Sequence, residues 1–135
     1  MQGQASVKCR KVAGPIRIFI AEDNEDLRAT VVALLSTEAD MRCVAETDEL
    51  QQVSALAAAA AADVIVLDIE LKGQSSLARL KQLRSELPAA RIVIYSGHGL
   101  PELVDAALAA GACAYVLKSG DPDELVRAVR RCASR

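Results

Sequence analysis

The sequence alternates between short β-rich runs and segments with helical periodicity, and this alternation occurs five times. The β-rich runs consist mainly of aliphatic residues, and they are Ile16–Ala21, Met41–Thr47, Val64–Leu67, Ile92–Tyr95 and Ala114–Leu117. Parallel strands need a crossover connection, so strands that alternate with helices favour a parallel sheet covered on both faces. The sequence therefore predicts an α/β fold, a doubly wound sheet of five parallel strands with five helices.

The expected helices have recognisable ends. The first begins at Asn24, and the alanine-rich segment 50–62 forms the second because alanine has the highest helix propensity. The third ends at Pro88 and the fourth at Gly111, residues that stop helices. The last begins at Asp121, which is followed by proline and acidic residues typical of a helix start.

The length of 135 residues fits one domain, expected over residues 16–135 after a flexible leader at residues 1–15. The leader lacks the apolar core of a signal peptide, and no apolar run is long enough to cross a bilayer. We therefore expect a cytoplasmic protein with no membrane partner. The net charge of −2 and the three aromatic residues argue against a nucleic-acid platform.

Four cysteines, Cys9, Cys43, Cys113 and Cys132, are far apart in the sequence, and the chain has a single histidine. No spacing typical of a zinc site occurs among them. The expectation for a cytoplasmic protein is four isolated, reduced thiols.

Chemistry-bearing side chains stand where the expected strands end. Glu22 and Asp23 follow the first strand, Asp68 follows the third, Ser96 the fourth and Lys118 the fifth. Each of them alone is more often a helix cap or a solvated side chain. In a doubly wound sheet, however, the carboxyl ends of the strands form one edge, and ligands bind there.

Clustered carboxylates repel one another unless a cation joins them. Mg²⁺ is the expected cofactor because it prefers carboxylate oxygens, water and phosphate oxygens. Asp68 is then a candidate nucleophile toward phosphorus, with Lys118 offsetting the charge on the transferred group and Ser96 donating a hydrogen bond to it. This constellation predicts phosphoryl chemistry.

These residues resemble the receiver domain of two-component response regulators, over residues 16–133. The segments Arg42–Thr47 and Gly111–Lys118 are most similar to receivers of the DNA-binding NarL/FixJ subfamily. The resemblance implies the flavodoxin-like receiver fold with strand order 2-1-3-4-5. It also implies a switch that accepts a phosphoryl group, assisting its own Mg²⁺-dependent phosphorylation and dephosphorylation, rather than an enzyme acting on a separate substrate.

The resemblance assigns a role to each matching position. It implies that Asp68 is phosphorylated and that Glu22, Asp23, Asp68 and the backbone carbonyl of Glu70 hold Mg²⁺. It further implies that Ser96 and Lys118 contact the phosphoryl group and that Tyr115 changes rotamer with phosphorylation. Glu70 and His98 occupy positions that tune hydrolysis of the acyl phosphate; the alternative for both is a solvated loop side chain.

The chain departs from the family pattern after Asp68. Leu71-Lys72 stands where Met-Pro is usual, and Ser75-Ser76 where Asp-Gly is usual. Without this proline and glycine, the loop is expected to loosen or to change its turn.

The resemblance also implies partners. A sensor histidine kinase or a phosphotransfer protein would supply the phosphoryl group, and a second copy of the chain is a candidate partner. The output surface would be the fourth helix, fifth strand and fifth helix. DNA would be bound only through an output domain outside this chain.

Three alternatives remain. A degenerate receiver would act as an interaction module without phosphorylation, and the altered loop is the feature in its favour. A phosphatase with an aspartate nucleophile usually has Asp-x-Asp, whereas this chain has Asp68-Ile69-Glu70. A flavodoxin-type cofactor binder needs a phosphate cradle after the first strand, where this chain is acidic.

Overall fold

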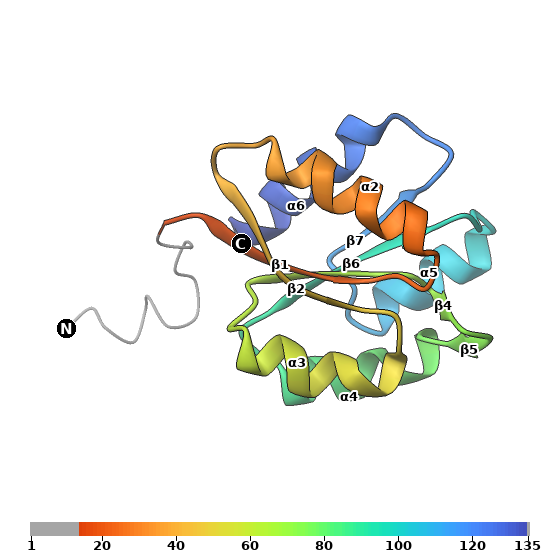
Figure 1. The fold of residues 1–135 in the computed structure, drawn as a ribbon. Coiled ribbons are helices and arrows are strands. Elements are labelled where there is room, and N and C mark those ends of the chain that lie inside the picture. Colours follow the sequence, from red (N-terminus) through yellow and green to blue (C-terminus); the bar gives the residue numbers. More distant parts are fainter. Residues whose placement is uncertain (1–13, 135) are drawn as a thin grey trace.

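The computed structural model describes residues 14–134, and its centre is a parallel sheet of five strands in the order β2-β1-β3-β6-β7 (Figure 1). The strands are β1 (Ile16–Ala21), β2 (Met41–Thr47), β3 (Val64–Leu67), β6 (Arg91–Ser96) and β7 (Ala114–Leu117). Since β6 and β7 are the fourth and fifth strands of this sheet, the predicted order 2-1-3-4-5 is confirmed. The expected leader at residues 1–15 falls almost wholly outside the described residues.

Helices cover both faces of the sheet. On one face lie α2 (Glu25–Ser36) and α6 (Pro122–Ala133), and on the other lie α3 (Val53–Ala59), α4 (Leu80–Glu86) and α5 (Pro101–Ala109) (Figure 1). Each face has its own apolar cluster of buried side chains. The doubly wound architecture inferred from the alternating sequence is therefore the one observed.

The central strand β3 shows why this sequence forms a covered sheet. All four of its residues are buried. Val64 and Val66 contribute to the apolar cluster beneath α2 and α6, whereas Ile65 and Leu67 contribute to the opposite cluster. A strand with successive side chains pointing to opposite apolar layers has to be hydrophobic at every position.

Two of the predicted helices begin with a tighter turn. The segment predicted as one helix over 50–62 opens with a 3₁₀ turn at Leu50–Gln52 and continues as α3, which ends at Ala59. A second 3₁₀ turn, Leu77–Arg79, precedes α4. The Arg17 guanidinium donates hydrogen bonds to the carbonyl oxygens of Ala60 and Ala61, groups left unpaired by the end of α3. Tertiary contacts therefore end α3 before its alanine run does.

The segment after Asp68, predicted as a loop, contains a short hairpin. Strands β4 (Glu70–Leu71) and β5 (Gln74–Ser75) pair antiparallel through a turn at Lys72 and Gly73. The φ angles of these two residues are 49° and 79°. Positive φ at both central residues is the geometry of a two-residue hairpin turn, which glycine favours. With Lys72 where proline is usual and Gly73 after it, the segment forms an ordered two-residue turn.

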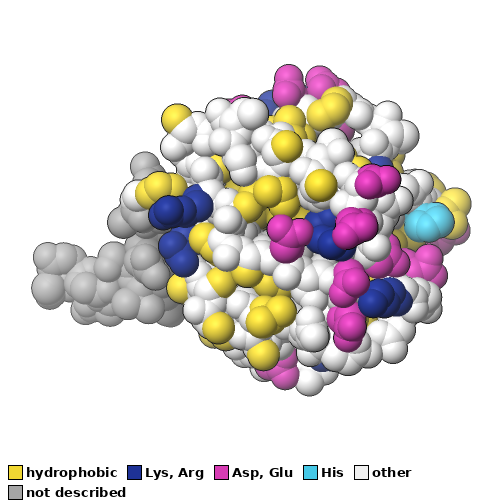
Figure 2. Space-filling view, in the orientation of Figure 1, with side chains coloured by type: hydrophobic (Ala, Val, Ile, Leu, Met, Phe, Trp, Pro, Cys, Tyr) yellow, Lys and Arg dark blue, Asp and Glu magenta, His cyan; other side chains and the backbone are white. Residues whose placement is uncertain are grey.

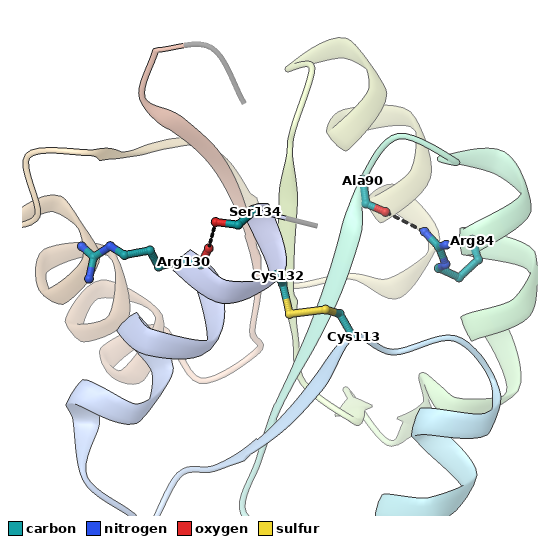
Figure 3. The surroundings of a disulfide bond; sticks show 6 residues. All are labelled: Arg84, Ala90, Cys113, Arg130, Cys132 and Ser134. Atoms are coloured by element: carbon teal, nitrogen blue, oxygen red, sulfur yellow. Dashed lines mark hydrogen bonds between the residues drawn. A yellow bond between two sulfur atoms is a disulfide. The ribbon is translucent and has the colours of Figure 1, made fainter. Parts of the chain in front are cut away.

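Two of the four cysteines form a disulfide, which corrects the expectation of isolated thiols. Cys113 precedes β7 and Cys132 lies in the last turn of α6, with their Cα atoms 6.1 Å apart (Figure 3). The sequence does not reveal this pair because 19 positions separate the two residues and only the packing of α6 brings them together. Cys43 is a free thiol, and Cys9 lies outside the described residues.

Candidate functional site

Three carboxylates lie together at the carboxyl ends of β1 and β3. Glu22 and Asp23 follow β1 and Asp68 follows β3, and one oxygen from each lies within 4.8 Å of the others. Glu22 and Asp68 are buried, while Asp23 is partly exposed at the rim. Among residues 14–134 this is the only group of three such side chains close enough to share a metal ion.

Lys118 joins two of these carboxylates. It follows β7, and its Nζ atom lies 2.8 Å from Oε1 of Glu22 and 2.9 Å from Oδ2 of Asp68. Burial alone would lower the pKa of Lys118, but the hydrogen bonds to Glu22 and Asp68 raise it above its ordinary value. Lys118 therefore carries a positive charge that offsets part of the negative charge of the pocket.

The carboxylate of Glu22 is the most strongly enclosed of the three. Burial raises its pKa, although the hydrogen bonds from Lys118 and from the backbone N–H of Asn24 oppose this shift. The backbone carbonyl of Glu22 accepts a hydrogen bond of 2.7 Å from the Arg28 guanidinium on α2. Asn24, which caps α2, and Arg28 in its first turn thus hold Glu22 in place after β1.

The hairpin after Asp68 holds the other two carboxylates. Oδ2 of Asp23 accepts a 2.7 Å hydrogen bond from the backbone N–H of Lys72, and Oδ1 of Asp68 accepts one of 3.2 Å from the N–H of Glu70. The buried Ser76 hydroxyl donates to the carbonyl oxygen of Asp68 at 2.7 Å. The Lys72 side chain also lies 3.2 Å from Asp48 in the segment after β2.

Neither Lys72 nor Ser76 was among the site residues inferred from the sequence. Lys72 contributes through its backbone N–H, a group that proline at that position would lack. The available signal was a residue followed by glycine between two short strands, which favours a hairpin turn. Lone serines give no comparable signal, so the role of Ser76 becomes visible only in the folded chain.

Ser96 and Tyr115 contact the same residue beside the pocket. Ser96 ends β6 and is fully buried, and its hydroxyl oxygen accepts a 3.0 Å hydrogen bond from the backbone N–H of His98. The Tyr115 hydroxyl, on β7, donates a hydrogen bond to the carbonyl oxygen of His98. The segment after β6 is therefore hydrogen-bonded both to a buried side chain, Ser96, and to a partly exposed one, Tyr115.

Glu70 and His98 line the same open pocket of about 290 Å³. Its other lining residues are Ile69, Ser75, Leu100 and Leu103. The two side chains thus come together from separate segments next to Asp68, on the hairpin after β3 and the segment after β6. The carboxylate and the imidazole stand at a mainly apolar pocket.

The chemistry of the donor set fits a hard divalent cation. Carboxylate oxygens from Glu22, Asp23 and Asp68 converge, and Asp23 is open to solvent, as a metal that retains water ligands requires. Figure 2 shows acidic side chains grouped around basic ones on the right-hand part of the drawn face. Lys118 already pairs with Glu22 and Asp68, so a cation would share these carboxylates with it.

The fold and the acidic edge define a class of doubly wound domains that bind ligands at the carboxyl ends of their strands. The family sequence model for the response regulator receiver domain matches residues 18–130 of this chain. The chain belongs to the response regulator receiver domain family.

Curated relatives place the chain among receivers of the NarL type. It is 33% identical over 120 residues to the nitrate/nitrite response regulator protein NarL of Escherichia coli strain K12, covering 89% of this chain and 56% of NarL. It is 35% identical over 118 residues to NarP of the same strain, covering 87% of this chain and 55% of NarP. The chain therefore spans about half the length of these relatives.

A solved structure supports the same placement. The signal receiver domain of the putative response regulator NarL from Mycobacterium tuberculosis has a TM-score of 0.83 and 30% sequence identity, covering 90% of this chain and 98% of that domain. Within the part of the chain that the structure describes, no helix combines the length and apolar character needed to cross a membrane.

Proposed function

We propose that this chain is a phosphoacceptor switch in which Asp68 receives a phosphoryl group from a sensor histidine kinase or a phosphotransfer protein. The observation that carries the proposal is the arrangement of Asp68, which lies 2.9 Å from the Lys118 ammonium and beside Glu22 and Asp23. A carboxylate attacking phosphorus needs nearby positive charge to offset the charge on the transferred group. Lys118 supplies part of that charge.

Glu22, Asp23, Asp68 and the backbone carbonyl of Glu70 would hold Mg²⁺ at this edge. The ion supplies electrostatic stabilisation of the phosphoryl oxygens when it is bound. Asp23 is oriented by the Lys72 N–H, and Asp68 is oriented by the Glu70 N–H and, through its backbone, by Ser76. These hydrogen bonds fix the carboxylates before a cation or a phosphoryl group arrives.

Ser96 and Tyr115 would connect phosphorylation to the surface. The Ser96 hydroxyl oxygen now accepts from the His98 N–H, and an aspartyl phosphate would give its O–H a charged acceptor. Turning Ser96 toward the phosphoryl group would lengthen its contact to His98. The Tyr115 hydroxyl is hydrogen-bonded to the carbonyl oxygen of His98, so Tyr115 would move when His98 moves. The surface concerned is formed by α5, β7 and α6, where the exposed leucines Leu108 and Leu117 lie. This surface is the proposed contact for a partner or a second copy of the chain.

Glu70 and His98 would tune the lifetime of the acyl phosphate. Both line an open pocket that also includes Ile69, the residue after Asp68, and through it they would bias the access of the attacking water. Comparing dephosphorylation half-lives of the wild type, Glu70→Ala and His98→Ala tests this role. Half-lives that are the same in all three proteins would contradict it.

The chain would act in the cytoplasm as the receiver part, residues 16–135, of a transcription regulator. The support is its similarity to NarL and NarP and the share of those relatives that it spans. DNA would then be contacted only by an output domain outside this sequence.

Incubation with Mg²⁺ and acetyl phosphate, followed by intact-mass measurement, tests the proposal. We expect a mass gain of one phosphoryl group in the wild type, none in Asp68→Asn, and none when a chelator removes the metal. A wild type that gains no mass would favour the degenerate receiver, which acts only through binding. A mass gain that persists in Asp68→Asn would place the modification elsewhere.

A further inference from the structure

The disulfide joins the two ends of the last βα unit. Cys113 immediately precedes β7, and Cys132 lies in the last turn of α6 (Figure 3). The separation of their Cα atoms, 6.1 Å, lies within the range that disulfides adopt without backbone movement. The folded backbone therefore places the two sulfur atoms for bonding without rearrangement.

The two sulfur atoms differ in accessibility. Cys132 is fully buried in the apolar cluster beneath α2 and α6, whereas Cys113 is only partly buried. Cys113 is therefore the more exposed end of the bond, the end at which a thiolate would attack. Cys43, the free thiol of the described residues, is on β2, at the opposite edge of the sheet from β7. Four strand spacings, roughly 19 Å, separate β2 from β7 and so keep Cys43 away from Cys113, the more exposed end of the bond.

We propose that Cys113 and Cys132 form a reversible thiol–disulfide site that small thiols such as glutathione open and their disulfides close. The reversibility rests on the cytoplasmic location proposed above, where the thiol pool reduces accessible disulfides. The bond links the last turn of α6 to the residue before β7. The redox state therefore sets the local stability of that turn.

The exchange proceeds in two balanced steps. A thiolate attacks Sγ of Cys113, and the S–S bond breaks so that the sulfur of Cys132 leaves and takes up a proton. The apolar surroundings of Cys132 favour this neutral thiol. A second thiolate then attacks the outer sulfur of the mixed disulfide, which releases Cys113 and a small disulfide. Two small thiols are thereby oxidised and the protein disulfide is reduced.

Opening the bond affects the end of α6 more than its body. Leu125, Val126 and Val129 stay buried against the sheet, so apolar contact holds most of the helix in either redox state. In the final turn Cys132 and Ala133 are buried, and Arg130 bonds Asp40 and Glu38. The backbone N–H of Ser134, however, bonds only within the turn, to the carbonyl oxygens of Arg131 and Cys132. Reduction is expected to increase amide exchange at residues 131–134 while the sheet remains protected.

The test uses the full chain carrying Cys9→Ser and Cys43→Ser, so that only the pair can react. One sample is incubated natively with glutathione disulfide and the other with dithiothreitol, and both are then denatured, alkylated and weighed. We expect no alkyl group on the oxidised protein and two on the reduced protein. The oxidised protein should melt on the order of 10 °C higher, because the cross-link restricts the unfolded chain.

Cys113→Ala in the same background is the matched control, since it removes the pair but leaves the buried Cys132. Its melting temperature should not depend on redox state. Three outcomes would each overturn the proposal. The oxidised protein could carry two alkyl groups, the protein treated natively with dithiothreitol could carry none, or the control could show the same shift in melting temperature as its parent. Asp68→Asn should keep the redox behaviour of its parent, so failure of the phosphoacceptor proposal is distinguishable from failure of this one.

Discussion

Ser96 and Tyr115 are coupled through the backbone of one residue, because Ser96 accepts the N–H of His98 and Tyr115 donates to its carbonyl oxygen. Ser96 is buried on β6, whereas Tyr115 lies on β7, the neighbouring edge strand. Movement of the segment after β6 therefore has to change both contacts. Under the proposed function, this coupling would pass an event at Asp68 to the α5–β7–α6 surface.

The first prediction is that Ser96→Ala and Tyr115→Phe have non-additive effects. Each substitution removes one hydrogen bond, whose net contribution to the unfolding free energy is about 1 kcal/mol. Because both bonds hold His98, losing the first should weaken the second, and the double variant should cost less than the sum. Urea unfolding of the four proteins measures the coupling. Additive losses would show that the two side chains act independently.

The second prediction concerns Lys118→Met, which leaves Glu22 and Asp68 without their shared cation. We expect a loss of about 2–3 kcal/mol in unfolding free energy without metal, somewhat below the cost for a fully buried pair because Lys118 is partly exposed. Added Mg²⁺ should stabilise the variant more than the wild type, because the ion replaces the missing positive charge. Thermal melts with and without Mg²⁺ measure this difference, and equal gains would mean that the ion binds away from Glu22 and Asp68.

The third prediction tests the hairpin that orients Asp23. Gly73→Val places a β-branched residue at φ 79°, which should cost about 1–3 kcal/mol. Displacing the turn also moves the Lys72 N–H away from Asp23, so Mg²⁺ affinity should fall as well. Calorimetric titration measures the affinity.

Gly97→Ala is the matched stability control for this substitution. A Cβ atom at Gly97 would meet no heavy atom within 4 Å, and its φ is not positive. The control should unfold close to the wild type. Should Gly73→Val bind Mg²⁺ as tightly as the wild type, the hairpin would have no part in orienting Asp23.

The fourth prediction is a pH dependence at the surface. The Arg130 guanidinium hydrogen-bonds Asp40 and holds the pKa of that carboxyl below its usual range (Figure 3 shows Arg130 on α6). Because the pKa of Asp40 is lower in the folded chain than its value near 3.8 in the unfolded chain, the ion pair stabilises the fold at pH values above 3.8. This stabilisation is lost as the pH falls through the pKa of Asp40 in the folded chain. Arg130→Gln should therefore be slightly less stable than the wild type at pH 7.

The difference between the two proteins should shrink at acidic pH and at high salt, because the pair is exposed to solvent. Chemical unfolding at pH 7 and pH 3 measures it. A difference that does not change with pH would assign the effect to the hydrocarbon part of the Arg130 side chain.

The sequence by itself determined the parallel sheet and the edge that carries the polar groups, and its resemblance to receiver domains implied the strand order. The reason is visible in β3, whose four apolar residues are buried on both faces and lead directly into Asp68. Once parallel strands pair in register, residues at their carboxyl ends share one edge. Glu22, Asp23, Asp68 and Lys118 are therefore neighbours for a reason that local patterns already contain.

Only the tertiary structure decided the hairpin, the disulfide and the shared contact at His98. Each depends on groups that no periodic pattern encodes: a backbone N–H at Lys72, a sulfur pair 19 positions apart, and a main-chain carbonyl. Hydrophobic periodicity fixes which face of an element is buried, but it does not fix how far an element extends or which polar atoms meet at its end. Those are settled when α3, α6 and the segments between the strands pack against the sheet, because buried polar groups then have to find partners within the fold.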